Sequence, residues 1–154
     1  MGFWSFLFGE NIRVEDEYFG SLKFVQLKKF DKSYFQGRRL FTPINKELEL
    51  GIDGELPGPT IAQKEFYRQI EENYHTLIPG IQELITDQFR NWKPEFTIQD
   101  FTQEFWLVHL SIPAVEQKEQ EPKWELAFET IHDQNHTFTV YMKGFLPDYV
   151  HIDG

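Results

Sequence analysis

Four carboxylic acid residues that lie close together are the part of this chain best suited to chemistry. They are Glu47, Glu49, Asp53 and Glu55, and no basic residue separates them. Positions 47, 49 and 53 would share one face of a strand, on which residues two apart lie roughly 7 Å from each other. Two carboxylates at that distance suit hydrolysis by a general acid and a base or nucleophile. On a solvated strand, the same groups would form an acidic contact surface for a basic protein.

The histidines are the other groups that suggest chemistry. His132 and His136 have the spacing of a metal-binding pair on a helix, but they fall between two predicted strands, where a solvated hairpin loop is the simpler interpretation. His109 lies inside a predicted strand, and a histidine satisfied within the core is favoured there over a catalytic base. The sequence also lacks cysteine, a phosphate-binding loop and a nucleophile elbow. We therefore expect no bound metal, no cofactor and no catalytic residue.

Composition limits the class of protein more firmly than these motifs do. Aromatic residues make up 17% of the 154 residues, and a chain of this length is expected to form one domain with a well-filled core. The absence of cysteine excludes a disulfide framework and fits a reducing, cytoplasmic setting. The longest apolar stretch, residues 2–9, is far shorter than the roughly 20 residues of a membrane span.

The net charge of −10 is unevenly distributed along the chain. Residues 18–46 contain seven basic residues against Asp31 alone, a balance of +6, so the remaining residues sum to −16. Such acidity disfavours nucleic acid, because phosphates are repelled, and it favours a basic protein partner. The alternative is that basic strands pair with acidic neighbours in a sheet while the excess acid serves solubility.

Alternating apolar and polar residues predict strands in the first and last thirds of the chain. The predicted strands span residues 22–29, 34–42, 47–53, 105–112, 124–129, 137–142 and 149–152. The segment 105–112 is largely apolar on both faces, which is typical of a central strand covered on both sides.

The middle third is predicted to be helical. Thr60 and Gln63 have the spacing of a capping box, which begins a helix. Apolar residues then recur every three or four positions and form one stripe, which includes Phe66, Ile70, Leu77 and Ile81. Because Pro79 interrupts this pattern, we expect two helices, or one kinked helix, over residues 61–91. A stripe with this spacing is typical of core residues rather than of a cofactor site.

The grouping of these elements predicts an α+β fold. Their order is β-β-β-α-α-β-β-β, in which strands are clustered instead of alternating with helices. We expect residues 10–154 to form a single domain, with one antiparallel sheet of six or seven strands and the helices packed on one face.

Residues 1–9 are expected to form a separate apolar N-terminal segment. Its large apolar side chains are Phe3, Trp4, Phe6, Leu7 and Phe8. So many exposed apolar groups favour docking on the protein body or self-association into a homo-oligomer. Insertion into a membrane surface is less favoured, because no basic residue precedes Arg13 to attract anionic lipid.

Four short stretches give the chain a resemblance to a known group of proteins. They are Asp16-Glu17-Tyr18-Phe19-Gly20 before a strand, Phe35-Gln36-Gly37, the strand from Glu47 to Ile52, and Pro59-Thr60-Ile61-Ala62-Gln63 at a helix start. Through them, over roughly residues 15–85 and more faintly at 150–154, the chain resembles uncharacterised small bacterial α+β domains. Some of these are similar to immunity proteins of polymorphic toxin systems. The resemblance carries no catalytic residue and implies an intracellular bacterial protein that works by binding.

Three functions remain open at this point. The leading hypothesis is a non-enzymatic binding protein of immunity or inhibitor type that presents Glu47, Glu49, Asp53 and Glu55 to a basic protein partner. The second is a small hydrolase that uses the carboxylates of the strand at residues 47–53. The third is a structural or assembly subunit that associates through residues 1–9.

Overall fold

The computed structural model describes residues 12–27, 32–115 and 121–154, which form one sheet, one long helix and one short helix. The strands are β1 (Ile12–Asp16), β2 (Gly20–Leu27), β3 (Lys32–Phe41), β4 (Lys46–Asp53), β5 (Phe105–Ile112), β6 (Lys123–Thr130), β7 (Asp133–Lys143) and β8 (Leu146–Asp153). The helices are α2 (Ile61–Phe89) and α3 (Phe101–Glu104). The predicted α+β class is confirmed.

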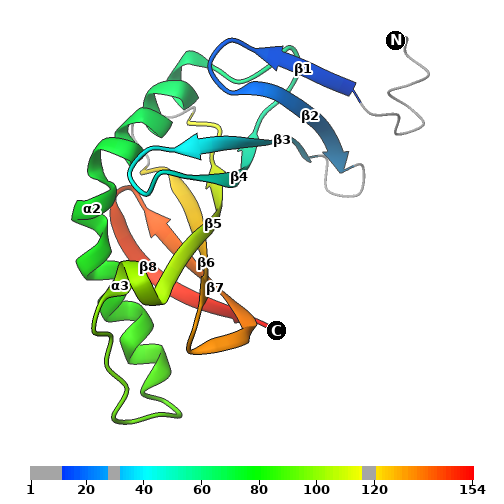
Figure 1. The fold of residues 1–154 in the computed structure, drawn as a ribbon. Helices are drawn as coiled ribbons and strands as arrows, with labels where there is room; N and C mark the ends of the chain where they lie inside the picture. Colours follow the sequence, from blue (N-terminus) through cyan, green and yellow to red (C-terminus); the bar gives the residue numbers. More distant parts are fainter. Residues whose placement is uncertain (1–11, 28–31, 116–120) are drawn as a thin grey trace.

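The eight strands form one open sheet in which their order is that of the chain (Figure 1). Neighbouring strands are antiparallel with one exception, because β4 and β5 run parallel and pair Glu49–Ile52 with His109–Ile112. The prediction of six or seven strands, all antiparallel, was therefore wrong in number and in this pairing. The parallel pairing follows from α2, which lies between β4 and β5 in the chain. The helix carries the chain back to the end of the sheet at which β4 began, so β5 runs in the same direction as β4.

Helix α2 begins where the sequence predicts. Thr60 accepts a hydrogen bond from the Gln63 amide through its hydroxyl at 3.2 Å, and the Gln63 side chain accepts one from the Thr60 amide at 3.0 Å. The helix then runs without a break through Pro79, so of the two predicted alternatives, two helices or one kinked helix, the structure has a single helix and the first was wrong. Proline removes one backbone donor, but Leu77 and Ile81 on either side of it are both buried, and the uninterrupted burial of this stripe offsets the loss.

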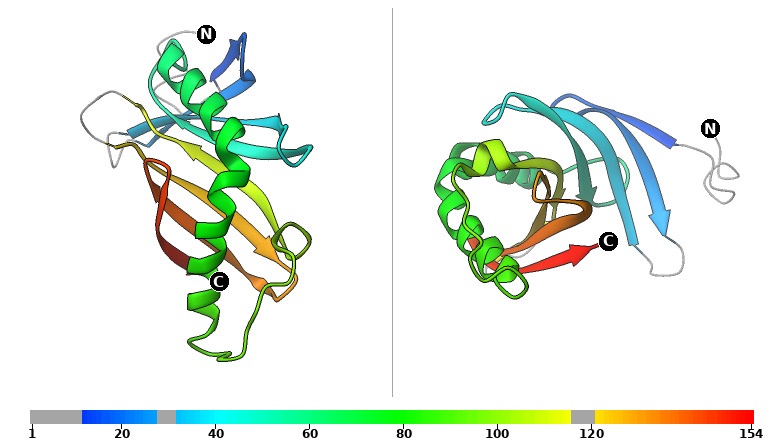
Figure 2. Two further views of the ribbon diagram at one scale, coloured as in Figure 1. Left: turned by 90° about the vertical axis from the view of Figure 1, so that its left-hand side faces the viewer. Right: turned by 60° about the horizontal axis from the view of Figure 1, so that its bottom comes forward.

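The helix lies across one face of the twisted sheet, as both views of Figure 2 show. Its apolar stripe meets the inward side chains of the strands, and the predicted core residues Phe66, Ile70, Leu77 and Ile81 are all buried. At its end, the Phe89 ring stacks on Phe96 at 4.2 Å and on Phe138 at 5.0 Å between ring centres. Much of the high aromatic content is therefore core packing. None of the described helices is both long and apolar enough to span a membrane.

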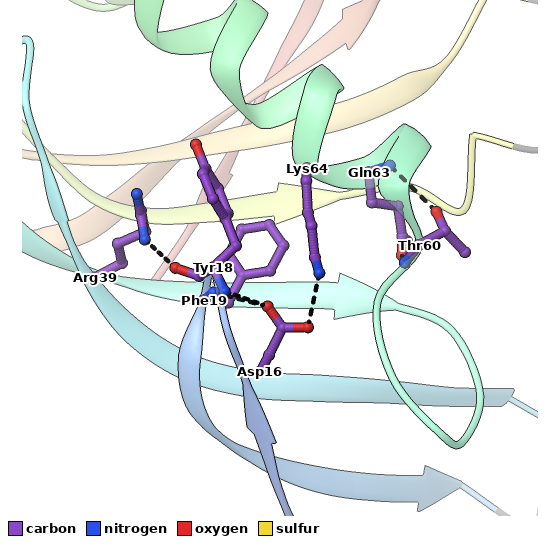
Figure 3. Close-up of polar contacts among 7 residues, drawn as sticks. All are labelled: Asp16, Tyr18, Phe19, Arg39, Thr60, Gln63 and Lys64. Atoms are coloured by element: carbon purple, nitrogen blue, oxygen red, sulfur yellow. Dashed lines mark hydrogen bonds and ion pairs between the residues drawn. The ribbon is translucent and has the colours of Figure 1, made fainter.

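The turn between β1 and β2 is tied to the start of α2 (Figure 3). The Asp16 carboxylate accepts hydrogen bonds from the amides of Tyr18 and Phe19 at 2.8 and 2.9 Å and forms an ion pair with Lys64 at 3.2 Å. Burial acts to raise the pKa of Asp16, but these hydrogen bonds and Lys64 outweigh it and lower the pKa. Gly20 follows with φ of +81°, a conformation that favours glycine. The motif at residues 16–20 thus has a structural role.

Candidate functional site

The carboxylates singled out from the sequence lie on the face of the sheet that α2 does not cover, called here the outer face. Leu48, Leu50 and Ile52 of β4 are buried in the core. Since successive side chains of a strand point to opposite faces, Glu47, Glu49 and Asp53 project outward together, and all three are exposed. Glu55 is also exposed, but it follows the strand in the loop before α2 and does not belong to this face.

Neighbouring strands add further carboxylates to the outer face. The pairings of β5 with β6, β6 with β7 and β7 with β8 place Glu125, Glu129 and Asp153 on it. Sequence reasoning missed these residues because they approach β4 only through the parallel β4–β5 pairing. The acidic face is defined here as Glu47, Glu49, Asp53, Glu125, Glu129 and Asp153. Its six carboxylates are distributed over β4, β6 and β8 rather than confined to one strand.

Basic residues on the outer face lie on β1–β3 and again at the end of the β6–β7 pair, where the register places Lys123 opposite Lys143. The pairing registers place Arg13 beside Lys23, and Arg38 beside Glu49, on this side of the sheet. Arg38 and Glu49 form an ion pair at 3.4 Å with side chains that are 60% and 53% exposed. Such an exposed pair contributes little to stability, about 0–1 kcal/mol. The predicted alternative, that basic strands pair with acidic neighbours, therefore holds for Glu49, but no described ion pair engages Glu47 or Asp53.

His109 lies in the middle of this face. The β4–β5 and β5–β6 registers place it beside Glu49 on one side and Ala127 on the other. Its ring lies against Gly51, because a Cβ atom added there would be 3.5 Å from the His109 Nε2 atom. A glycine within a strand usually weakens it, and here the missing side chain makes room for the imidazole.

The environment of His109 differs from the prediction. We expected a histidine satisfied within the core, but the side chain is half-buried on the outer face, and no hydrogen bond to its ring is found among the described residues. The error has a physical cause: the apolar residues of β5 suggested cover on both sides, whereas α2 covers one side. Burial lowers the pKa of His109, and the negative charges of Glu125 and Glu49 oppose this shift.

Two tyrosines extend the outer face toward the C-terminal edge of the sheet. Tyr141 of β7 pairs with Tyr149 of β8, and their rings stack with centres 4.5 Å apart. Tyr149 remains 52% exposed. Burial and the neighbouring Glu125 raise the pKa of Tyr141, so its hydroxyl stays protonated. Tyrosines of this kind are enriched in protein interfaces, where they add apolar area and a hydrogen-bonding group.

The other two predicted histidine positions do not form a joint site. His132 lies in the turn between β6 and β7, as predicted, but His136 already belongs to β7. Each histidine faces its own carboxylate: His132 Nε2 lies 2.6 Å from Glu104 Oε1, and His136 Nδ1 lies 2.7 Å from Asp133 Oδ2. Within residues 12–27, 32–115 and 121–154, no three histidine, aspartate or glutamate side chains gather in a metal-binding arrangement.

Acid/base chemistry requires a carboxylate or histidine that faces a substrate held in a cleft. Three clefts lined by described residues lie around Phe96, Arg90 and Tyr74. None of the three is lined by a carboxylate of the acidic face or by His109. The predicted association residues Phe3, Trp4, Phe6, Leu7 and Phe8 lie outside the described part of the chain.

Comparison with known protein families, with curated proteins and with solved structures finds no significant match to this chain.

Proposed function

We propose that this protein is a non-enzymatic binding protein that contacts a basic protein partner through its acidic face. The observation that carries the proposal is that Glu47, Glu49 and Asp53 of β4 share one sheet face with Glu125 and Glu129 of β6, across the intervening strand β5, and that all five are exposed or half-exposed on this face without a covering helix. A surface with an excess of one sign of charge raises the rate of encounter with an oppositely charged partner. This is the manner in which an immunity or inhibitor protein would cover the basic cleft of a toxin, inside a bacterial cytoplasm.

The distribution of basic residues supports an oriented complex. Arg13, Lys23 and Arg38 occupy the part of the outer face formed by β1–β3, while the carboxylates of the acidic face lie on β4, β6 and β8, with Lys123 and Lys143 at one end of the β6–β7 pair. A positively charged partner would be attracted to the carboxylates of β4, β6 and β8 and repelled by the basic residues of β1–β3 and by Lys123 and Lys143. The stacked Tyr141 and Tyr149 lie at the far edge of the acidic part, where they offer apolar contact area.

A hydrolase is the second candidate, and one observation favours it. His109 is half-buried next to Glu49, and its lowered pKa keeps it neutral at neutral pH, as a general base requires. The two functions differ in their response to Glu49→Gln. If the intact protein hydrolyses a substrate and the Glu49→Gln variant does not, the hydrolase is supported. A binding protein shows no turnover of substrate either as the intact protein or as the variant.

Affinity capture from the source cells tests the binding proposal. The bait is the intact protein, compared with the double variant Glu47→Lys and Glu49→Lys. The matched control is Glu83→Lys with Asp87→Lys, which makes the same change in net charge at exposed positions of α2, on the covered side of the sheet. We expect a basic protein to be captured by the intact protein and by the control, and to be lost with the double variant. Equal capture by all three would contradict the proposal.

A further inference from the structure

Strands β4 and β5 are hydrogen-bonded only over their C-terminal halves. The register joins Glu49–Ile52 to His109–Ile112, although β4 begins at Lys46 and β5 begins at Phe105. Before these pairs the two strands diverge, as Figures 1 and 2 both show, with the β3–β4 turn on one side and α3 on the other. The result is a wedge in the sheet, open at the N-terminal ends of both strands.

The wedge contains a cleft of about 470 Å³. This volume is within the usual range of ligand sites, roughly 300–1,000 Å³. The floor is apolar and is formed by the buried side chains of Tyr74, Phe101 and Phe105. On the β4 side, the cleft is lined by Ile44 and Lys46. On the β5 side, it is lined by Thr102, Gln103, Trp106 and Leu107.

Both walls of the cleft are strand segments, and each lacks a hydrogen-bonded strand partner on the side that faces the cleft. Residues 46–48 pair with β3, and residues 105–107 pair with β6, but no pairing joins the two segments to each other. In a strand, alternate residues direct their N–H and C=O groups to opposite sides. Apart from the Phe105 amide, which donates to the Phe101 carbonyl, each wall therefore presents backbone donors and acceptors to the cleft, as the free edge of a sheet does.

One charged group gives the wedge further selectivity. Lys46 lines the cleft, is exposed, and forms no ion pair within the part of the chain that the structure describes. A carboxylate on the ligand would complement it. The unpaired stretch of β4 is three residues long, which corresponds to about 10 Å of extended chain.

We propose that this wedge binds a short extended peptide segment that pairs with the free edges of β4 and β5. An apolar side chain of the peptide contacts Tyr74, Phe101 and Phe105, and an acidic side chain next to it contacts Lys46. Backbone hydrogen bonds supply affinity and the two side-chain contacts supply selectivity, as in other cases where a peptide is added to a sheet. The site shares the backbone of Glu47 with the acidic face, but it takes a ligand of opposite charge preference through other side chains, so neither proposal depends on the other.

The test uses nuclear magnetic resonance of the intact, ¹⁵N-labelled protein with the probe acetyl-Leu-Thr-Leu-Asp-amide. We expect saturable shifts of the backbone amides of residues 46–48 and 105–108, with a dissociation constant on the order of 1 mM or tighter. The same probe with N-methylated backbone amides should not bind, because it cannot donate to the strand edges. Binding of both probes alike, or shifts confined to other residues, would overturn the proposal, as would no shift up to about 5 mM probe.

A pair of lysine variants tests the charge contact. Lys46→Met should weaken binding of the Asp-containing probe several-fold and leave binding of an Asn-containing probe unchanged. Lys123→Met is the matched control, since Lys123 is also an exposed lysine near the start of a strand but does not line the cleft. Equal weakening by both variants, or an unchanged affinity with Lys46→Met, would exclude the contact with Lys46.

Discussion

Gln63 is expected to contribute far more stability than its role in the capping box implies. Its side chain is buried, with 1% exposure, and makes three hydrogen bonds. It accepts one from the Thr60 amide and donates to the backbone carbonyls of Asp53 and Pro113, the latter at 2.9 Å. These bonds join the end of β4, the start of α2 and the segment after β5. Each hydrogen bond contributes about 0.5–1.5 kcal/mol net, so Gln63→Leu should cost about 2–4 kcal/mol.

Thr60→Ala provides the matched comparison. Thr60 is exposed, and its side chain makes the single capping bond to the Gln63 amide, shown in Figure 3. Its loss should cost about 1 kcal/mol. Urea unfolding of the three proteins, followed by circular dichroism, gives both free-energy changes. A cost for Gln63→Leu equal to or below that of Thr60→Ala would refute the reasoning, because it would mean that the two carbonyl contacts contribute nothing.

Two further predictions concern the core and the outer face. Ile70→Ala should cost about 2–5 kcal/mol because the side chain is fully buried under the sheet, whereas Ile61→Ala, at a position that is 83% exposed, should change the free energy of unfolding by less than about 0.5 kcal/mol. His109 should make stability depend on pH, since its lowered pKa means that the unfolded chain binds a proton more readily than the folded protein. Stability should therefore fall as pH drops below the ordinary histidine pKa of about 6.5, by at most about 1.4 kcal/mol per pH unit from this group. His109→Gln should lose less stability than the natural protein over the same pH range in urea titrations, and an equal loss would contradict the assigned environment of His109.

The start of α2 and its buried face could be predicted because they depend on residues that are close together in the sequence. The Thr60–Gln63 capping box and the apolar stripe of α2 depend on residues a few positions apart, and both are present as expected. Pro79 misled the prediction, since the energy that keeps the helix continuous comes from packing against the sheet. β1 was missed because its five residues carry apolar side chains only at Ile12 and Val14, too short a pattern to distinguish from a loop.

Pairing between distant strands could not be predicted. The parallel contact of β4 with β5 joins residues some sixty positions apart and is decided by how α2 crosses the sheet. For this reason, the alternation at residues 47–53 revealed that Glu47 and Glu49 share a face, but nothing in the sequence placed Glu125 or His109 next to them. The cleft between the diverging halves of β4 and β5 has the same origin and left no sequence signal.

The most direct test of the central claim is the salt dependence of association with the captured basic partner. Association rates of the intact protein and of the Glu47→Lys, Glu49→Lys variant are measured by surface plasmon resonance over a range of ionic strength. We expect the variant to associate markedly more slowly at low salt and the difference to shrink as salt rises, while both proteins unfold at nearly the same urea concentration. Equal association rates at low salt would show that the acidic face takes no part in binding.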